Sequence, residues 1–313
     1  MPLGLRRGVV TAVVEAHERL IRLEVDGLAC VAYPRLTGDV EVGDEVLVNE
    51  QARLLELGSG GFDVLYANLT RGLGLEPEEG AHVMALPYTP GQVTVCYKEE
   101  SDALVDELDG LPVVLCTLHS QVTPVCAALA GVRVAYVQVV GGALPVSLSD
   151  AVRTLKERGL VEIATAVAPC FDGDAQFVTV AAALAWAKDQ GHGAVVCSVG
   201  PGIVGTGTRL GHGALSLAEA ANVASALGGR PVLAVRISDA DPRERHRGVS
   251  HHVQAVLDLC LGEVVVPEDA QGEGWEAACA GLPLLHMGRG RDDDPAFFRA
   301  AYAAGVAARL LAR

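Results

Sequence analysis

The chain has 313 residues, half of them hydrophobic, and a formal net charge of −15. So many apolar residues exclude an intrinsically disordered chain and are enough for a large core. The acidic balance argues against duplex nucleic acid and anionic membranes as partners, since both attract basic surfaces. The sequence has no apolar run near the roughly 20 residues of a membrane helix and no features of a signal peptide, so we expect a cytoplasmic protein.

The eight cysteines show no Cys-x-x-Cys spacing. Several of them, such as Cys116 and Cys197, lie inside apolar runs. We therefore expect buried, reduced thiols and no zinc site built from cysteine.

Residues 1–75 are predicted to form a small β-barrel or sandwich. Short segments rich in β-branched residues alternate with turn residues such as Gly27 and Gly43, which is typical of small all-β domains. The expected strands cover residues 9–14, 20–25, 28–33, 45–48 and 62–66.

Residues 76–110 are predicted to be a linker with flanking strands, because glycine and proline interrupt the segment. Strands are expected at 83–87 and 92–97, and they either extend the barrel or cover an edge of the next sheet. A short helix is expected at 101–108, with Ser101 as its N-cap.

Residues 111–313 are predicted to form an α/β domain. Short apolar runs alternate with longer amphipathic stretches, which indicates a doubly wound, mostly parallel sheet with helices on both faces. Strands are expected at 113–118, 132–139, 163–167, 194–199, 232–237, 263–266 and 284–287, and helices at 121–130, 149–158, 174–190, 216–227, 251–261, 274–280 and 296–312.

The loops after the strands differ from the loops after the helices. Helix-to-strand loops are brief and contain capping glycines, whereas strand-to-helix loops are longer and carry most of the unusual polar residues. In a parallel sheet the latter emerge at the carboxyl edge, where open α/β sheets bind ligands. We expect a ligand-binding crevice there, lined by loops 119–120, 140–145, 169–174, 200–215 and 238–250.

Loop 200–215 is rich in glycine, so its backbone N–H groups could converge on an anion. It lacks the Gly-Lys-Ser/Thr of a P-loop, and Ser216-Leu-Ala-Glu219 predicts a capping box that starts the next helix too late for these glycines to lie at its N-terminus. An anion cradle and a merely tight loop both remain open. The ligand-binding candidates are Gly200, Gly202, Gly205, Thr206, Gly207 and Thr208, with Gly141 and Gly142 from the neighbouring loop.

Residues 236–252 combine histidines, aspartates and arginines. Ser250 is the expected N-cap of a helix whose first turn holds His251 and His252, where the helix dipole favours neutral imidazole. Adjacent helical side chains point about 100° apart, so at most one of the two is expected in a shared site. Proton transfer or ligand contact, metal binding and a structural role all remain open. The catalytic candidates are Asp241, His246, His251 and His252, and the metal candidates are Asp239, His246 and His251.

Three arginines of this segment, Arg236, Arg243 and Arg245, are candidates for binding a carboxylate or phosphate group, or else they tie the loop down through Asp–Arg pairs. Elsewhere His119 and Ser120 end the first strand of the α/β domain, and both are ligand-binding candidates.

Ser120 is either a helix N-cap or a nucleophile beside a histidine. Asp174 is the expected N-cap of the next helix, and Asp172 is a ligand or base candidate.

The segment Gly-Gly-Ala-Leu-Pro at 141–145 and the segments 200–208 and 236–252 resemble an uncharacterised bacterial family, a domain of unknown function, over nearly the whole chain. The resemblance implies no activity and no cofactor. It also implies an aspartate before the first motif and a Gly-His pair further on, where this chain has Val140 and Pro169-Cys170. A mechanism that needs a charged group at 140 or an imidazole near 169 is therefore not expected.

Taken together, the residues indicate an enzyme that acts on a small anionic metabolite, phosphorylated or nucleotide-like. A non-catalytic ligand-sensing or interaction module and a metal-dependent hydrolase are the alternatives. The sequence identifies no cofactor, and a homo-oligomer is compatible with it.

Overall fold

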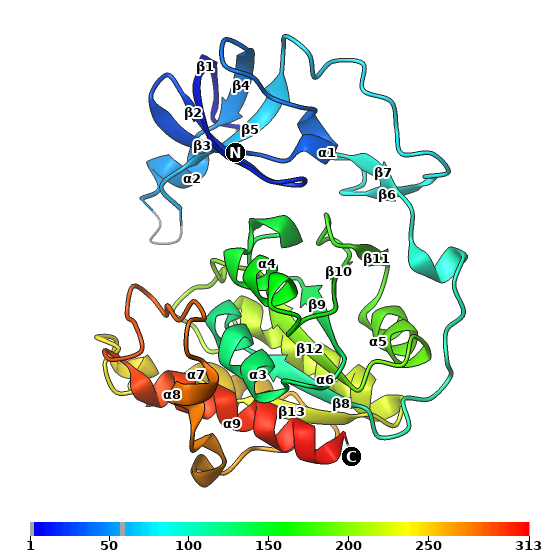
Figure 1. The fold of residues 1–313 in the computed structure, drawn as a ribbon, viewed down its shortest axis with the longest axis vertical. Coiled ribbons are helices and arrows are strands. Elements are labelled where there is room, and N and C mark those ends of the chain that lie inside the picture. Colours follow the sequence, from blue (N-terminus) through cyan, green and yellow to red (C-terminus); the bar gives the residue numbers. More distant parts are fainter. Residues whose placement is uncertain (1–2, 57–59, 313) are drawn as a thin grey trace. The chain divides into compact units, whose positions relative to one another are not determined.

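The computed structural model describes residues 3–56 and 60–312 (Figure 1). The chain forms two compact units, one ending at Cys96 and the other beginning at Tyr97. Within the described ranges, none of the helices combines the length and the apolar character that crossing a bilayer requires.

The first unit contains the predicted barrel. Five strands close in the order β1-β2-β3-β5-β4 around a core of alternating apolar side chains such as Leu23, Val46 and Val48. Asp63 is buried in this unit, where Arg6 and Arg53 neutralise its charge at 3.0 and 2.8 Å. The elements are β1 (Leu5–Ala16), β2 (Ile21–Val25), β3 (Leu28–Ala32), α1 (Pro34–Thr37), β4 (Glu45–Asn49), α2 (Gln51–Leu54) and β5 (Asp63–Asn68).

The segment between barrel and sheet differs in part from its prediction. Two short strands, β6 (Val83–Ala85) and β7 (Val93–Val95), form a separate antiparallel pair. The helix expected at 101–108 is wrong, since only a 3₁₀ turn, η1 (Lys98–Glu100), precedes an irregular segment. Asp102 is held there by the indole N–H of Trp186 at 2.8 Å, so tertiary contacts replace the local helix.

The second unit contains the predicted parallel sheet. Its six strands lie in the order β11-β10-β9-β12-β8-β13, and every pair in it is parallel. The strands are β8 (Pro112–Cys116), β9 (Val134–Val139), β10 (Ile163–Val167), β11 (Ala175–Phe177), β12 (Ala194–Val199) and β13 (Arg230–Ala234).

Helices cover both faces of this sheet, as predicted (Figure 1). Alternate strand residues point into two separate cores: Val113 and Leu115 into one, Val114 and Cys116 into the other. The helices α3 (Val122–Ala128), α4 (Asp150–Glu157) and α9 (Pro295–Leu311) pack on one face, and α5 (Val180–Asp189), α6 (Ser216–Ala226) and α7 (His251–Leu257) on the other.

The neighbouring strands β8 and β12 therefore lead to opposite faces, since β8 is followed by α3 and β12 by α6. This arrangement is a topological switch point, the place where open α/β sheets bind ligands at their carboxyl edge. The remaining elements are the two-stranded ribbon of β14 (Ile237–Ser238) and β15 (Gly248–Val249), and the single-turn helix α8 (Trp275–Ala278).

Three expected elements around the sheet are corrected. The helix expected from residue 174 begins only at Val180, capped by Thr179, because the buried residues 175–177 pair with β10 as strand β11. Asp174 caps no helix; it accepts the N–H of Ala164 and bonds Lys156.

The strands expected at 263–266 and 284–287 reduce to isolated bridges of Val265 with Val232 and of His286 with Arg289. Pro267 follows the first of these segments and lacks an N–H for further pairing, while Gly288 lies inside the tight turn of the second.

Glycines allow the loops after β9 and β12 to pack backbone against backbone. A Cβ on Gly142 would lie 2.2 Å from the carbonyl oxygen of Gly200, and one on Gly213 would lie 2.0 Å from that of Gly141. Hydrogen bonds from Ala143 N–H to Pro201 and from Val204 N–H to Gly141 join the same loops, at 2.8 and 2.9 Å.

We expect Gly142→Ala to destabilise the protein by about 1–3 kcal/mol, because two backbones must separate to admit the methyl group. Gly207→Ala is the matched control, since a Cβ there meets no atom within 4 Å. Urea unfolding would measure both variants, and equal stabilities would contradict this account of the loop packing.

Candidate functional site

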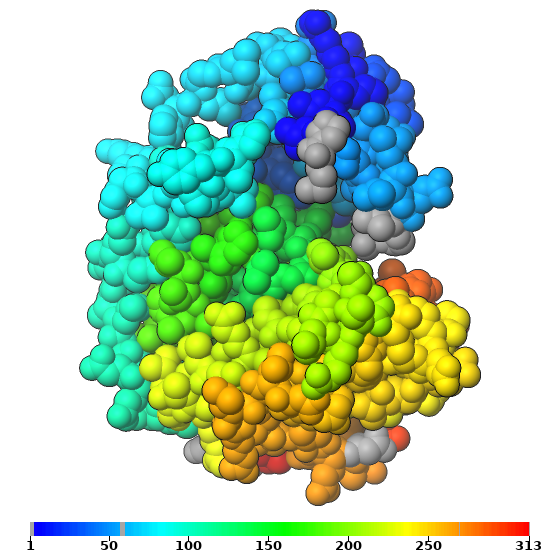
Figure 2. Space-filling view, turned by 180° about the vertical axis from the view of Figure 1, so that it is seen from behind, coloured from blue at the N-terminus to red at the C-terminus, as the bar shows by residue number. Residues whose placement is uncertain are grey.

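The strand-to-helix loops of the second unit contact one another at the carboxyl edge of the sheet. His119, after β8, bonds the carbonyl oxygen of Val199 at the end of β12 at 3.1 Å. Phe171, after β10, donates its N–H to Leu144 in the loop after β9 at 3.2 Å. Figure 2 shows the yellow-green loop 200–211 on the surface beside the yellow segment near residue 250.

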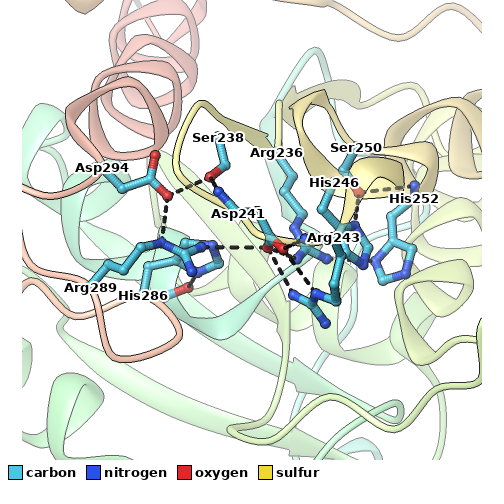
Figure 3. Close-up of polar contacts among 11 residues, drawn as sticks. Arg236, Ser238, Asp241, Arg243, His246, Ser250, His252, His286, Arg289 and Asp294 are labelled. Atoms are coloured by element: carbon cyan, nitrogen blue, oxygen red, sulfur yellow. Dashed lines mark hydrogen bonds and ion pairs between the residues drawn. The ribbon is translucent and has the colours of Figure 1, made fainter.

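Arg236 lies at the centre of the polar network that follows β13 (Figure 3). Its side chain is only 2% exposed. One terminal nitrogen donates to His252 Nδ1 at 3.1 Å, and the other lies 3.5 Å from the carboxylate of Asp241. Burial, and next the charge of Arg243, lower the pKa of Arg236 to about 10.

Asp241 gathers the arginines of this network. Its fully buried carboxylate accepts the backbone N–H and two guanidinium N–H groups of Arg243, and it lies 3.5 Å from Arg289. Burial alone would raise the pKa of Asp241, but the hydrogen bonds from Arg243 outweigh it and hold the pKa below its usual value. These contacts hold Asp241 as an anion that positions guanidinium groups, and its catalytic role stays a prediction.

The turn before α9 ties this network to the last helix. Asp294 accepts the hydroxyl of Ser238 at 2.6 Å and Nε of Arg289 at 3.1 Å. His286 stacks on Phe297 of α9, with the ring centres 3.7 Å apart and the planes 1° from parallel. In Figure 3, Arg289, His286 and Asp294 therefore lie on one side of Asp241, and His246 and His252 lie on the other.

Four histidines form a layer of rings on that second side. Ser250 caps α7 as predicted, accepting the N–H of His252, and also bonds His246 Nδ1 at 2.8 Å. His212, from the end of the glycine-rich loop, stacks on His252 at 3.8 Å and touches His251 edge-on at 5.6 Å.

The expectation that at most one of His251 and His252 belongs to a shared site is therefore wrong. Their rings lie 4.5 Å apart, and both contact His212. The helical offset keeps adjacent side chains from converging on one point, but this cluster is a layer in which each ring packs against its neighbours.

Several buried polar atoms of the network have no hydrogen-bond partner among the described residues. They are one ring nitrogen of His212, Nε2 of His251 and His286, Nε of Arg236 and Oδ1 of Asp294. Leaving a buried polar group unpaired lowers the free energy of unfolding by about 1–3 kcal/mol. The presence of several unpaired atoms in one network therefore needs a physical explanation. A polar ligand that pairs with these atoms would supply one.

The histidines of the network are neutral. Burial, followed by the charges of nearby arginines or histidines, lowers the pKa of His246 and His286 to about 3 and that of His252 to about 2. Burial and then Arg245 also lower the pKa of His251. These rings can therefore donate and accept hydrogen bonds near neutral pH without carrying charge.

The donor set does not fit a metal ion. Ring nitrogens of His212, His251 and His252 lie within 4.8 Å of one another, so their proximity alone would allow a metal ion, but the ring orientations do not. The planes of His212 and His252 are 17° from parallel, so their in-plane lone pairs do not converge on one point.

The partner of His252 also has the wrong polarity for metal binding. Arginine has only donors, so the contact from Arg236 makes His252 Nδ1 the acceptor and places the ring proton on Nε2. A histidine that binds a metal instead donates its second nitrogen to an acceptor. Two of the predicted metal candidates are also absent from the histidine trio, namely His246 and the exposed Asp239.

The glycine-rich loop divides into a fixed part and an exposed part. Gly200, Gly141 and Gly142 serve backbone packing, which leaves no room for a ligand against their Cα atoms. Gly202, Gly205 and Gly207 are exposed, as are Thr206 and Thr208, whose hydroxyls bond each other at 2.8 Å. The predicted capping box is wrong, since the Ser216 hydroxyl donates to the carbonyl of Gly213 instead.

His119 and Ser120 pair with partners from different loops. His119 Nε2 lies 2.6 Å from the hydroxyl of Ser149, and burial lowers its pKa to about 4. Ser120 does not cap a helix; its hydroxyl lies 3.2 Å from His286 Nδ1. Asp172 is buried, with its backbone at a φ of +65°, in the loop after β10.

Sequence reasoning missed four members of the network: His212, His286, Arg289 and Asp294. His212 ends the glycine-rich loop in a Gly-His-Gly sequence, and this was a usable signal. Residues 286–294 follow a short apolar run that was assigned to a strand, so nothing local marked them as part of a site.

Fold and site together define an α/β protein with an N-terminal β-barrel and an arginine–histidine network at the carboxyl edge of its sheet. The chain belongs to the family described as Protein of unknown function (DUF3866), which matches residues 29–280. No curated protein matches the chain.

Acidification should destabilise the protein. An unfolded chain protonates these histidines near pH 6.5, whereas the folded chain keeps His119, His246, His252 and His286 neutral to about pH 4 or below. The unfolded state then binds more protons, so stability falls through that window by up to about 1.4 kcal/mol per pH unit for each histidine. Urea unfolding at several pH values measures this slope.

His246→Gln should reduce the slope, and His82→Gln, at an exposed histidine, should not. The same slope in His246→Gln and in the unsubstituted protein would contradict the assignment.

We also expect no stoichiometric zinc to remain after incubation with Zn²⁺ and dialysis. Elemental analysis measures the retained metal. One equivalent of zinc that His251→Ala loses would show that the rings rearrange to bind an ion.

Proposed function

We propose that the protein is an enzyme that acts on a small anionic metabolite, phosphorylated or nucleotide-like, at the carboxyl edge of its sheet. The observation that carries the proposal is His212. Its ring is buried, and among the described residues only one of its two nitrogens has a partner, the backbone of Arg209. The ring lies against His251 and His252 beside a buried arginine. An anionic oxygen there would accept hydrogen bonds from neutral imidazole N–H groups.

The charge of the network favours an anion over a cation. Three guanidinium groups, from Arg236, Arg243 and Arg289, face two carboxylates, although the whole chain carries a charge of −15. Arginines are also among the charges that lower the pKa of His251 and His286. A local positive potential attracts phosphate or carboxylate groups.

Arg245 is the arginine best placed to contact the ligand. It is exposed, has no ion-pair partner among the described residues, and supplies the largest charge effect on His251. Arg243 and Arg289, in contrast, are engaged by Asp241 and Asp294. We therefore assign direct anion contact to Arg245 and an electrostatic contribution to the others. The exposed backbone N–H groups of Gly205 and Gly207 are further donors, whereas that of Thr206 is bonded to Gly211.

His251 is the proposed proton-transfer group. It is half-buried in the first turn of α7, and its Nε2 has no partner in the described chain. A bound anion would offset the charge of Arg245, which raises the pKa of His251 toward the range where general acid–base catalysis is effective.

A panel of phosphate, sulfate, nucleotides, sugar phosphates and carboxylates should contain at least one clear stabiliser. A ligand at 100 times its Kd stabilises the folded state by about 2.7 kcal/mol, which raises the melting temperature by several degrees. Arg245→Ala should shrink this shift. Arg247→Ala is the matched control, because Arg247 is exposed two residues away and is not among the charges that perturb His251.

A flat panel, or a shift that both arginine variants retain in full, would refute anion binding at this loop. Turnover of the stabilising compound, lost in His251→Ala, would establish an enzyme. Binding without turnover would instead identify a ligand-sensing module.

A further inference from the structure

We propose that Ser120 is a nucleophile that His286 activates, and that it accepts a phosphoryl group from the anionic substrate as a covalent phosphoserine. This inference rests on the proposed function, because it names the step that the anion would undergo. It adds a reacting residue from the loop after β8. The site residues assigned above lie in the segments that follow β12 and β13.

Ser120 is well placed for this role. It lies directly after β8, at the switch point of the sheet, within a 3₁₀ turn formed by His119–Gln121. The side chain of Gln121 accepts the N–H of Leu118 at the start of that turn, so the hydroxyl of Ser120 has no capping role. Ser120 is half-buried, and its hydroxyl lies 3.2 Å from His286 Nδ1. A nucleophile within hydrogen-bond reach of a histidine is the arrangement that covalent catalysis requires.

His286 is held rigidly as the partner base. Its ring stacks on Phe297, and its backbone pairs in both directions with Arg289 at 2.8 and 2.9 Å. The surrounding arginines and burial keep the ring neutral, so Nδ1 is available to accept the proton of Ser120. Nε2 then carries the ring hydrogen, and it is a buried donor without a partner among the described residues.

Phosphoryl transfer through Ser120 takes place in two stages. The Ser120 oxygen attacks phosphorus, its proton passes to His286 Nδ1, and the bond from phosphorus to the leaving oxygen breaks. The leaving oxygen takes the proton from His286. Water then attacks the phosphoserine, gives a proton to His286, and releases inorganic phosphate as Ser120 recovers its hydrogen.

Substrate binding would strengthen this base. Burial comes first among the causes that keep the pKa of His286 low, followed by Arg236 and Arg289. A phosphate dianion near these guanidinium groups offsets their charge, so the pKa of His286 rises when the site is occupied. The base is then effective only with substrate present.

A second serine–histidine pair lies nearby, but its hydrogen bonds stabilise the fold. Ser149 lies 2.6 Å from His119, yet it is only 3% exposed and its oxygen already caps α4 by accepting the N–H of Val152. His119 in turn bonds the carbonyl of Val199, so it links the loop after β8 to the end of β12 and to the start of α4. Among the described residues, the Ser120 hydroxyl bonds His286 and caps no helix.

The test uses the full chain and a fluorophosphonate, whose phosphorus Ser120 would attack with loss of fluoride. Intact mass and peptide mapping should place one label on Ser120. Ser120→Ala should abolish the label, and Ser147→Ala, at a buried hydroxyl without a partner among the described residues, should leave it unchanged. His286→Phe keeps a stacking ring but removes the acceptor, so labelling should slow on the order of 100-fold.

Thermal shifts with inorganic phosphate, measured on the same samples, separate this inference from the proposed function. A phosphate shift in Ser120→Ala shows that the variant is folded and still binds the anion. A phosphate shift without any label, or a label on Ser149, overturns the nucleophile and leaves anion binding standing. Labelling that persists in Ser120→Ala, or at full rate in folded His286→Phe, also overturns it. A label on Ser120 without a phosphate shift overturns phosphoryl transfer.

Discussion

A guanidinium buried to 2% exposure constrains everything around it, because its charge is kept near neutral pH and must be balanced by neighbouring groups. Arg236 meets this constraint with two kinds of partner, the carboxylate of Asp241 and the lone pair of His252. The first fixes the loop after β13, and the second fixes the tautomer of a histidine in α7. Its charge also helps to keep His246 and His286 neutral. Together with burial, this one buried cation therefore keeps the rings on both sides of Asp241 unprotonated.

The scaffold brings these groups together through its topology and its glycines. β8 and β12 send their following helices to opposite faces, so their loops part at the carboxyl edge. Gly141, Gly142 and Gly213 let the loops after β9 and β12 touch through their backbones, which anchors the hairpin that ends in His212. The glycines closest to the sheet thus serve packing, and only the exposed ones remain for ligand contact.

The sequence predicted the barrel, the parallel sheet and the strand-to-helix loops, because hydrophobic period and turn residues are local signals. It did not predict strand β11, since three buried residues beside a long helix carry no separate period. It also misjudged His251 and His252, because the ring on which they pack, His212, comes from a distant loop. His286 and Arg289 escaped notice for the same reason: their roles depend on Ser120, Asp241 and Asp294, which only the fold brings near.

The balance of charge in the network supports the proposed anion binding more strongly than any single contact does. A purely structural cluster would reach lowest energy with each arginine matched by a carboxylate and each histidine paired. Here the guanidinium groups outnumber the carboxylates, and His212, His251 and His286 each keep a ring nitrogen without a partner in the described part of the chain. Under the proposed function, this arrangement is oriented before an anion binds, as in preorganised sites that stabilise negative charge. The unpaired buried groups destabilise the free protein, and a bound anion would offset that destabilisation by pairing with them.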